Sequence, residues 1–265
     1  MGAGADPRGG VGVGPSRRSG AGSASDYHDE VIDRFGRGFT VLAAAATGFV
    51  LVALAIVPFL NPVWVAFEQG RAGALELTGY DRPELDAATG AILADLVFGP
   101  PAFDVEVRGE PVLSERERGH MADVRGVFGG FALVVAVAAV ALAAAWVLAG
   151  RPEGGRRAFW RAVDRGARVV AVGIVVVGVI ALVAFDFLFE IFHRLFFASG
   201  TYTFDPGSER LVQLFPFGFW FETAIAVGVV ILVLAVLTAV FARRRADVPA
   251  RGESAPAAAA LEGAR

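Results

Sequence analysis

Four long apolar segments set the fold of this chain. They lie at about 39–60, 127–149, 169–189 and 217–241, and each has roughly the 20 residues with which an α-helix crosses a hydrocarbon core of about 30 Å. Hydrophobic residues make up 55% of the chain and the mean hydropathy is +0.57. Segments of this length and composition leave no polar face for solvent. We therefore predict an all-α membrane protein with four transmembrane helices.

Arginine is concentrated in the connection between the second and third segments. Residues 150–168 contain six arginines against two acidic residues, and three further arginines, at 243–245, follow the fourth segment. The positive-inside rule places such clusters in the cytoplasm. The sequence thus predicts a multi-pass protein of the cell membrane with both termini cytoplasmic, and with residues 61–126 and 190–216 outside.

The two ends of the chain differ in composition from the segments between them. Residues 1–25 and 246–265 are rich in small residues and poor in the large apolar side chains that offset ordering entropy. We expect two disordered tails around a membrane domain at 26–245.

Residues 61–126 are long enough to form a small extracytoplasmic cap between the first and second helices. Asp81 or Asp86 is placed to cap a helix, and the residues around Gly109 alternate as in a hairpin or an edge strand. Residues 114–117, "SERE", have the capping-box pattern of a helix that continues into the second span.

Several classes of chemistry are excluded by what the chain lacks. It has no cysteine, which removes disulfides, thiolate nucleophiles and Cys-ligated metals. No glycine-rich phosphate loop follows a strand pattern, and the net charge of -3 argues against a nucleic-acid partner. No serine stands in a nucleophile elbow, and the nearest hydroxyls, Ser199 and Thr201, lie in a loop. We expect no cofactor.

Two of the three histidines reach the predicted outer face from different spans. His120 precedes the second span and His193 follows the third, whereas His28 lies beside the N-terminal tail on the inner side. Imidazole exchanges a proton near neutral pH, so we predict that His120 and His193 are catalytic. With Asp123 and Glu190 they would also make a suitable set of metal ligands, but no HExxH-like spacing supports this, and we predict no metal.

Carboxylates accompany both histidines. Asp123 follows His120 by three residues and Glu190 precedes His193 by three, so each is placed to orient an imidazole. Asp186, Glu190 and His193 would share one face of a helix that continues past the membrane edge. An ionisable residue at membrane depth indicates function. The alternative is that Asp186 reaches the headgroups or pairs with a nearby arginine, and that Glu190 only marks the interface.

Aromatic residues crowd the same predicted edge. They are typical of an ordinary aromatic belt at headgroup depth. They would equally suit a lipid-accessible cleft in which acyl chains lie beside the polar groups, and for that role we select Phe196, Phe197, Tyr202, Phe215, Phe219 and Trp220.

Two segments carry a family resemblance. "ERERGHMADVRGVF" at 115–128 and "FHRLFFASGTYTFDPGSERLVQLFPFGFW" at 192–220 resemble the lipoprotein intramolecular transacylase family, and the four-span layout is similar as well. Carried over position by position, the family's site residues fall on His120, His193, Asp123, Asp205 and Pro206. Tyr202 stands where the family has a tryptophan.

The resemblance implies an acyltransferase at the outer leaflet. Such an enzyme moves an acyl chain from the diacylglyceryl-cysteine of a lipoprotein to the α-amino group of the same cysteine. The substrate supplies the nucleophile, so a protein Ser or Cys is unnecessary. The partners expected are a diacylglyceryl-modified lipoprotein or another membrane lipid, and the membrane. The alternative is a non-enzymatic scaffold or sensor whose cap binds a partner.

Overall fold

The computed structural model describes residues 24–100, 102–150 and 154–247. The chain divides into two units, Met1–Gly38 and Phe39–Arg265, and the first helix, α1 (Ala24–Ile56), begins in one and ends in the other. Residues 1–23 and 248–265, which make up most of both predicted tails, lie outside the described residues. Within the second unit, the described residues 39–247 contain the cap, His120 and His193.

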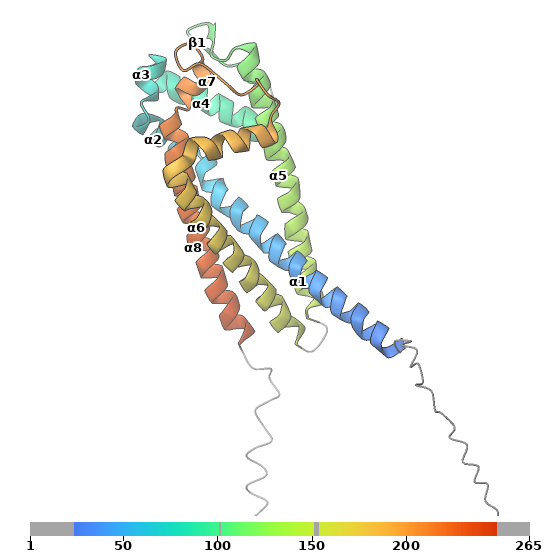
Figure 1. Ribbon diagram of the computed structural model, residues 1–265. Helices are drawn as coiled ribbons and strands as arrows, with labels where there is room; N and C mark the ends of the chain where they lie inside the picture. Colours follow the sequence, from blue (N-terminus) through green and yellow to red (C-terminus); the bar gives the residue numbers. More distant parts are fainter. Residues whose placement is uncertain (1–23, 101, 151–153, 248–265) are drawn as a thin grey trace, which may run out of the picture. The chain divides into compact units, whose positions relative to one another are not determined.

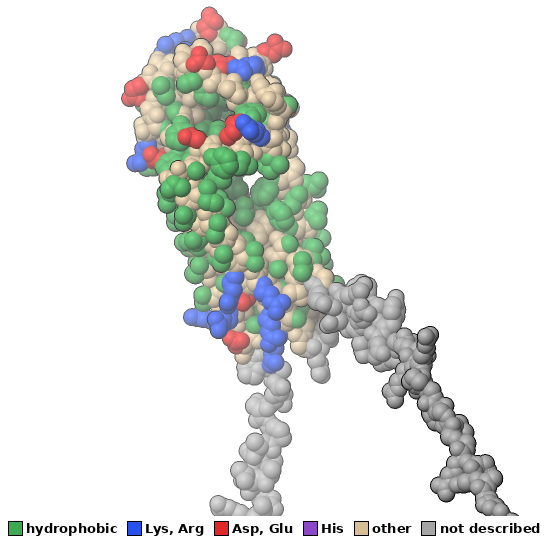
Figure 2. All heavy atoms as spheres, viewed as in Figure 1, with side chains coloured by type: hydrophobic (Ala, Val, Ile, Leu, Met, Phe, Trp, Pro, Cys, Tyr) green, Lys and Arg blue, Asp and Glu red, His purple; other side chains and the backbone are tan. Residues whose placement is uncertain are grey.

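Four helices are long and apolar enough to cross a membrane: α1 with the 3-10 turn η1 (Val57–Leu60), α5 (Glu115–Leu148), α6 (Gly155–Phe196) and α8 (Phe217–Ala246). Most large apolar side chains on them point outward, as a lipid solvent requires. Figure 2 shows this apolar surface between two ends that carry charge. The predicted all-α, four-span membrane fold is confirmed.

Small residues bring the spanning helices together. The longest contact is between α6 and α8, where Ala167 and Ala235 are fully buried. Helix α1 crosses α6 at Gly166, and a Cβ atom placed on Gly166 would lie 2.3 Å from the carbonyl oxygen of Ala44. Helix association in lipid depends on such close backbone approach, since apolar burial supplies little driving force there.

We therefore expect Gly166→Ala to destabilise the bundle by about 1–3 kcal/mol, the usual cost of overpacking, because the new methyl group meets backbone that cannot move alone. Thermal unfolding in detergent would measure the loss. Gly173→Ala on the same helix is the matched control, because a Cβ atom there meets nothing within 4 Å. Equal melting temperatures for the two variants would contradict this packing.

The connection between the first and second spans and the connection between the third and fourth spans together form one cap. The first contributes α2 (Pro62–Arg71), α3 (Ala74–Thr78), α4 (Arg82–Val97) and the strands β1 (Glu106–Val107) and β2 (Glu110–Pro111). The second contributes α7 (Arg210–Leu214). Leu211, Leu214 and Phe215 share a single apolar core with Leu85 and Ile92 of α4. The cap is thus not confined to the segment between the first and second spans, as the sequence had suggested.

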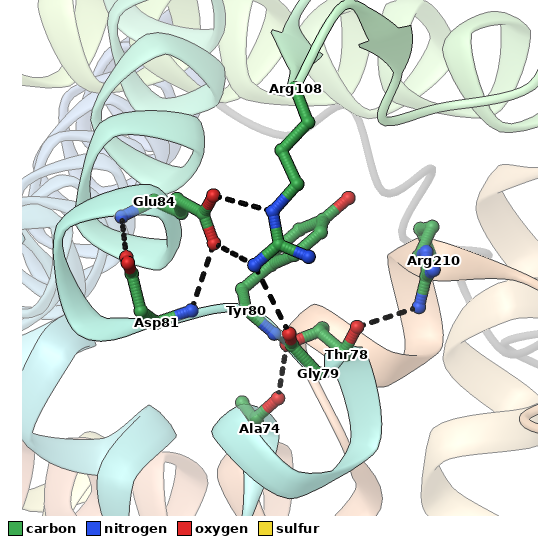
Figure 3. Close-up of polar contacts among 8 residues, drawn as sticks. All are labelled: Ala74, Thr78, Gly79, Tyr80, Asp81, Glu84, Arg108 and Arg210. Carbon is green, nitrogen blue, oxygen red and sulfur yellow. Dashed lines mark hydrogen bonds and ion pairs between the residues drawn. The ribbon is translucent and has the colours of Figure 1, made fainter.

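Polar contacts join the elements of the cap (Figure 3). Asp81 and Glu84 form a capping box at the start of α4. The hairpin turns at Arg108 and Gly109, both with positive φ, and from this turn Arg108 donates two hydrogen bonds of 2.6 Å to Glu84. The Arg108 guanidinium lowers the pKa of the Glu84 carboxyl. Arg210 of α7 donates to the Thr78 carbonyl at 3.0 Å.

Helix α6 bends sharply at Ala184, where φ is -147° and ψ is 44°. The Phe185 ring packs 5.5 Å from Phe217 and 5.4 Å from Phe221 of α8, which anchors the chain just past the bend. Residues 185–196 then run across the bundle from α8 toward α5, below the cap (Figure 1). The helix thus continues past residue 189, as predicted, but aromatic packing on α8 turns it across the bundle.

Candidate active site

The bend brings His193 of α6 opposite His120 of α5. The two imidazole rings stack with centroids 6.1 Å apart and an interplanar angle of 22°. Both side chains are buried, at 7% exposure for His120 and 8% for His193. The structure thus brings together, from two helices, the residues that the sequence predicted as the catalytic pair.

His193 has a defined tautomer. Its Nδ1 lies 2.7 Å from the carbonyl oxygen of Phe189. A carbonyl oxygen only accepts, so the hydrogen bond requires the proton on Nδ1. In the neutral ring, Nε2 then carries the lone pair and can accept a proton.

His120 is held by aromatic rings. Phe197 and Phe204 lie edge-on to it at 4.8 Å and 5.5 Å. Phe197 also contacts the ring of His193 at 5.4 Å, so one side chain touches both histidines. The buried Nδ1 of His120 has no hydrogen-bond partner among the described residues. A buried polar atom without a partner requires an explanation, and one explanation is a group that binds there.

A buried carboxylate, Glu117, holds the loop beside His120. Glu117, 2% exposed, accepts from its own N-cap residue, Ser114, through Oε2 and from the Leu211 backbone N–H through Oε1, both at 2.7 Å. The first contact completes the capping box expected from "SERE". The second ties α5 to α7, and sequence reasoning missed it although Glu117 belongs to the family-like motif.

Arg116 secures the same loop from the other side. It donates to the Thr203 carbonyl at 2.8 Å, pairs with Glu209, and lies 4.6 Å above the ring of Phe204. Phe204, which the sequence analysis did not select, is thus fixed between a cation and His120.

Replacing Glu117 with Gln is expected to destabilise the protein by about 1–3 kcal/mol. A glutamine can accept only one of the two backbone N–H groups, and its own amide N–H₂ then faces the other donor. Glu115→Gln, at an exposed position in the same turn, is the control. The melting temperature in detergent measures the difference, and an unchanged value for Glu117→Gln would show that the bridge contributes nothing to stability.

Among the described residues, neither predicted carboxylate orienter forms a hydrogen bond with its histidine. Asp123 is exposed and makes no hydrogen bond to His120. Glu190 accepts from Arg194 at 2.6 Å, and its place beside His193 is taken by the Phe189 carbonyl, one helical turn back. In the described part of the chain, Asp186 is exposed and has no hydrogen-bond or ion-pair partner. That these carboxylates orient the imidazoles stays a prediction; at His193 it is the Phe189 carbonyl that binds Nδ1.

Two other predicted supporters have distinct places. The Tyr202 ring lies 5.2 Å from His193, and its hydroxyl donates to Glu190 at 3.2 Å, so Glu190 reaches the site through Tyr202. Asp205 lies in the loop and accepts from Gly207 and Ser208, which lowers its pKa. Pro206 offers its carbonyl to Gln213. The Asp-Pro pair therefore shapes the loop.

The aromatic residues selected as a lipid cleft divide into two groups. Phe197 is buried against the histidines, and Phe215 and Phe219 belong to the cap core. Phe196 and Trp220 are exposed, at 48% and 42%. Trp220 also contacts Phe189, the residue that positions His193. Only the exposed pair can face lipid beside the histidines.

Glu222 belongs to a separate polar cluster between α2 and α8. It pairs with Arg71 at 2.6 Å and lies within hydrogen-bonding reach of Glu68. Burial, and then the neighbouring carboxylate, raises the pKa of Glu68. No group of three or more His, Asp or Glu in the described ranges is arranged to hold a metal ion.

Four spanning helices and one continuous cap define an integral membrane protein that buries a histidine pair between two of its helices. The model of the family "Lipoprotein intramolecular transacylase Lit" matches residues 41–220, more than half of the chain. The protein belongs to this family and is an acyltransferase, as the resemblance in sequence indicated.

Solved structures of the lipoprotein intramolecular transacylase Lit from Bacillus cereus have the same fold. One has a TM-score of 0.66 and 18% identity, over 80% of this chain and 96% of the other. A histidine-to-arginine variant of that protein has a TM-score of 0.64 and 18% identity, over 84% and 96%. A histidine-to-alanine variant has a TM-score of 0.63 and 18% identity, over 82% and 96%. No curated protein matches the sequence significantly.

Proposed function

We propose that this protein moves an acyl chain within a lipoprotein, from the diacylglyceryl group on the N-terminal cysteine to the α-amino group of that cysteine, with His120 and His193 as the acid and base. The observation that carries the proposal is the stacked pair of buried imidazoles, 6.1 Å apart, on two different helices.

The reaction needs two proton transfers and no protein nucleophile. The α-amine attacks the ester carbonyl, the new C–N bond forms and the C–O bond to glycerol breaks. The attacking nitrogen loses one proton and the departing glycerol oxygen gains one, so no proton is consumed. Two imidazoles within reach of one carbonyl carbon can perform both transfers.

The geometry favours His193 as the base. The Phe189 carbonyl holds the proton on Nδ1, which leaves the lone pair of Nε2 to take the proton of the amine. His120 then serves as the donor to the oxyanion and to the glycerol oxygen. Burial among Phe197, Phe204 and Tyr202 excludes water, which favours transfer to the amine over hydrolysis.

A synthetic diacylglyceryl lipopeptide with a free α-amine, incubated with the reconstituted protein, tests the proposal. Because the product is an isomer of the substrate, fragmentation mass spectrometry must locate the acyl chain on the N-terminus. His120→Ala and His193→Ala are each expected to slow the transfer by about 10²–10⁴-fold, the range for a lost general acid or base.

The third histidine supplies the control, because His28→Ala should retain full activity. An N-acetylated lipopeptide should not react. If either His120→Ala or His193→Ala folds normally and transfers at the original rate, histidine acid–base catalysis is wrong. If the unmodified protein transfers no acyl chain to this substrate, another lipid substrate must be sought.

We also infer that the cap and the histidines face outward. Arginines cluster at the start of α6 and at the end of α8, on the side of the bundle away from the cap, and such clusters stay in the cytoplasm. The absence of cysteine makes this testable. Glu110→Cys in the hairpin should react with an impermeant maleimide added to intact cells, whereas Arg244→Cys should react only after lysis. The reverse pattern would invert the orientation.

A further inference from the structure

A groove of about 460 Å³ opens between the spanning helices, far from the histidine pair. Its volume falls within the roughly 300–1,000 Å³ typical of small-molecule sites. All four spanning helices line it. The lining residues include Thr47, Val50, Leu51 and Leu54 of α1, Leu142 and Trp146 of α5, Trp160 of α6 and Thr238 of α8. Apart from the two threonines the lining is apolar or aromatic, so a ligand must be apolar along its length.

This groove is separate from the candidate active site. Trp146 follows His120 by 26 residues on the same helix, which places it roughly 40 Å further along at 1.5 Å per residue. The Trp146 end of the groove is therefore remote from the imidazoles, and the inference does not rest on the proposed transfer.

Aromatic rings and guanidinium groups form the end of the groove. The Trp160 ring contacts Trp146 at 5.4 Å and Phe241 at 5.5 Å. The Arg156 guanidinium lies 3.5 Å from the centroid of the Trp146 ring, and that of Arg245 lies 5.0 Å from Phe241. Cations therefore flank both sides of the aromatic row that closes the apolar space.

Two arginines at this rim keep their charge unpaired within the part of the chain that the structure describes. Arg156 and Arg245 are exposed, and within the described ranges neither has an ion-pair partner. The first turn of α6, where Arg156 lies, contains no acidic residue, and its N-cap, Gly154, provides no side-chain cap. The helix N-terminus adds to the positive potential. By contrast, Arg168 further along α6 is paired with Asp164 at 2.9 Å.

We propose that the groove binds an acyl chain of an anionic phospholipid whose headgroup phosphate lies against Arg156, beside Trp146. Apolar walls ending in unpaired cations complement an amphiphile with a negative head. Helix α5 contacts the remaining spans near its C-terminal end, through Ala145 and Ala149, so a lipid beside Trp146 would fill the space between α5 and its neighbours.

Native mass spectrometry of the full chain in a neutral detergent tests this site. Phosphatidylglycerol and phosphatidylcholine with identical chains are added in competition. We expect retention of one phosphatidylglycerol in preference to phosphatidylcholine. Arg156→Gln should reduce that preference by about fivefold, since a basic residue near an anionic lipid contributes about 1 kcal/mol. Arg168→Gln, whose charge is already paired, is the control and should leave the preference unchanged.

Filling the groove tests the acyl-chain part separately. Val50→Trp and Leu54→Trp each place an indole in the lining, and Leu54 is 57% exposed, so that variant is expected to fold. Both should lower retention of either lipid by about tenfold or more. Equal retention of the two lipids by the unmodified protein, no effect of both groove variants, or displacement by soluble glycerol phosphate would each overturn the proposal.

Discussion

The buried carboxylate of Glu117 joins the two connections of this protein. Its two oxygens accept backbone N–H groups from Ser114 and Leu211, which lie 97 residues apart in sequence. A charged group this deeply buried is tolerated only when its lone pairs are satisfied, and here the partners come from the starts of two helices. The hydrogen bond to Leu211 holds α7 against α5. The loop between α6 and α7 is thereby held in place, and its residues Phe197 and Phe204 pack against His120.

The second requirement of the site is the bend at Ala184. If α6 were straight, each residue after Ala184 would lie about 1.5 Å further along the helix axis, and the chain would not cross toward α5. His193 would then not lie opposite His120. Aromatic packing of Phe185 on α8 turns the last three turns of α6 across the bundle instead. The same transverse run leaves the Phe189 carbonyl to orient His193. The stacking of His193 on His120 thus depends on contacts made with the first residues of α8.

The arginines at the two ends of the bundle have different partners. In the cap, arginines are matched to carboxylates, as in the pairs Arg108–Glu84 and Arg116–Glu209. At the other end, Arg156 and Arg245 rest on aromatic rings and keep their charge available. One end is thereby a folded polar cap over a buried site. The other end presents cations beside an apolar groove, an arrangement that suits a leaflet of anionic lipids.

Local patterns were sufficient to predict the four spans, the capping box at Ser114 and the two histidines. Hydropathy over 20 residues and cap spacing are properties of the chain itself, and they act through the backbone hydrogen bonds that lipid demands. The histidines could be selected because ionisable groups are scarce beside apolar segments. The sequence did not predict the acceptor at His193: Glu190 has the right spacing, yet the Phe189 carbonyl binds Nδ1 of His193. The bend at Ala184, the shared cap core and the tie from Glu117 to Leu211 were decided by tertiary structure alone. Each depends on which distant side chains and backbone groups meet, and no local periodicity encodes that.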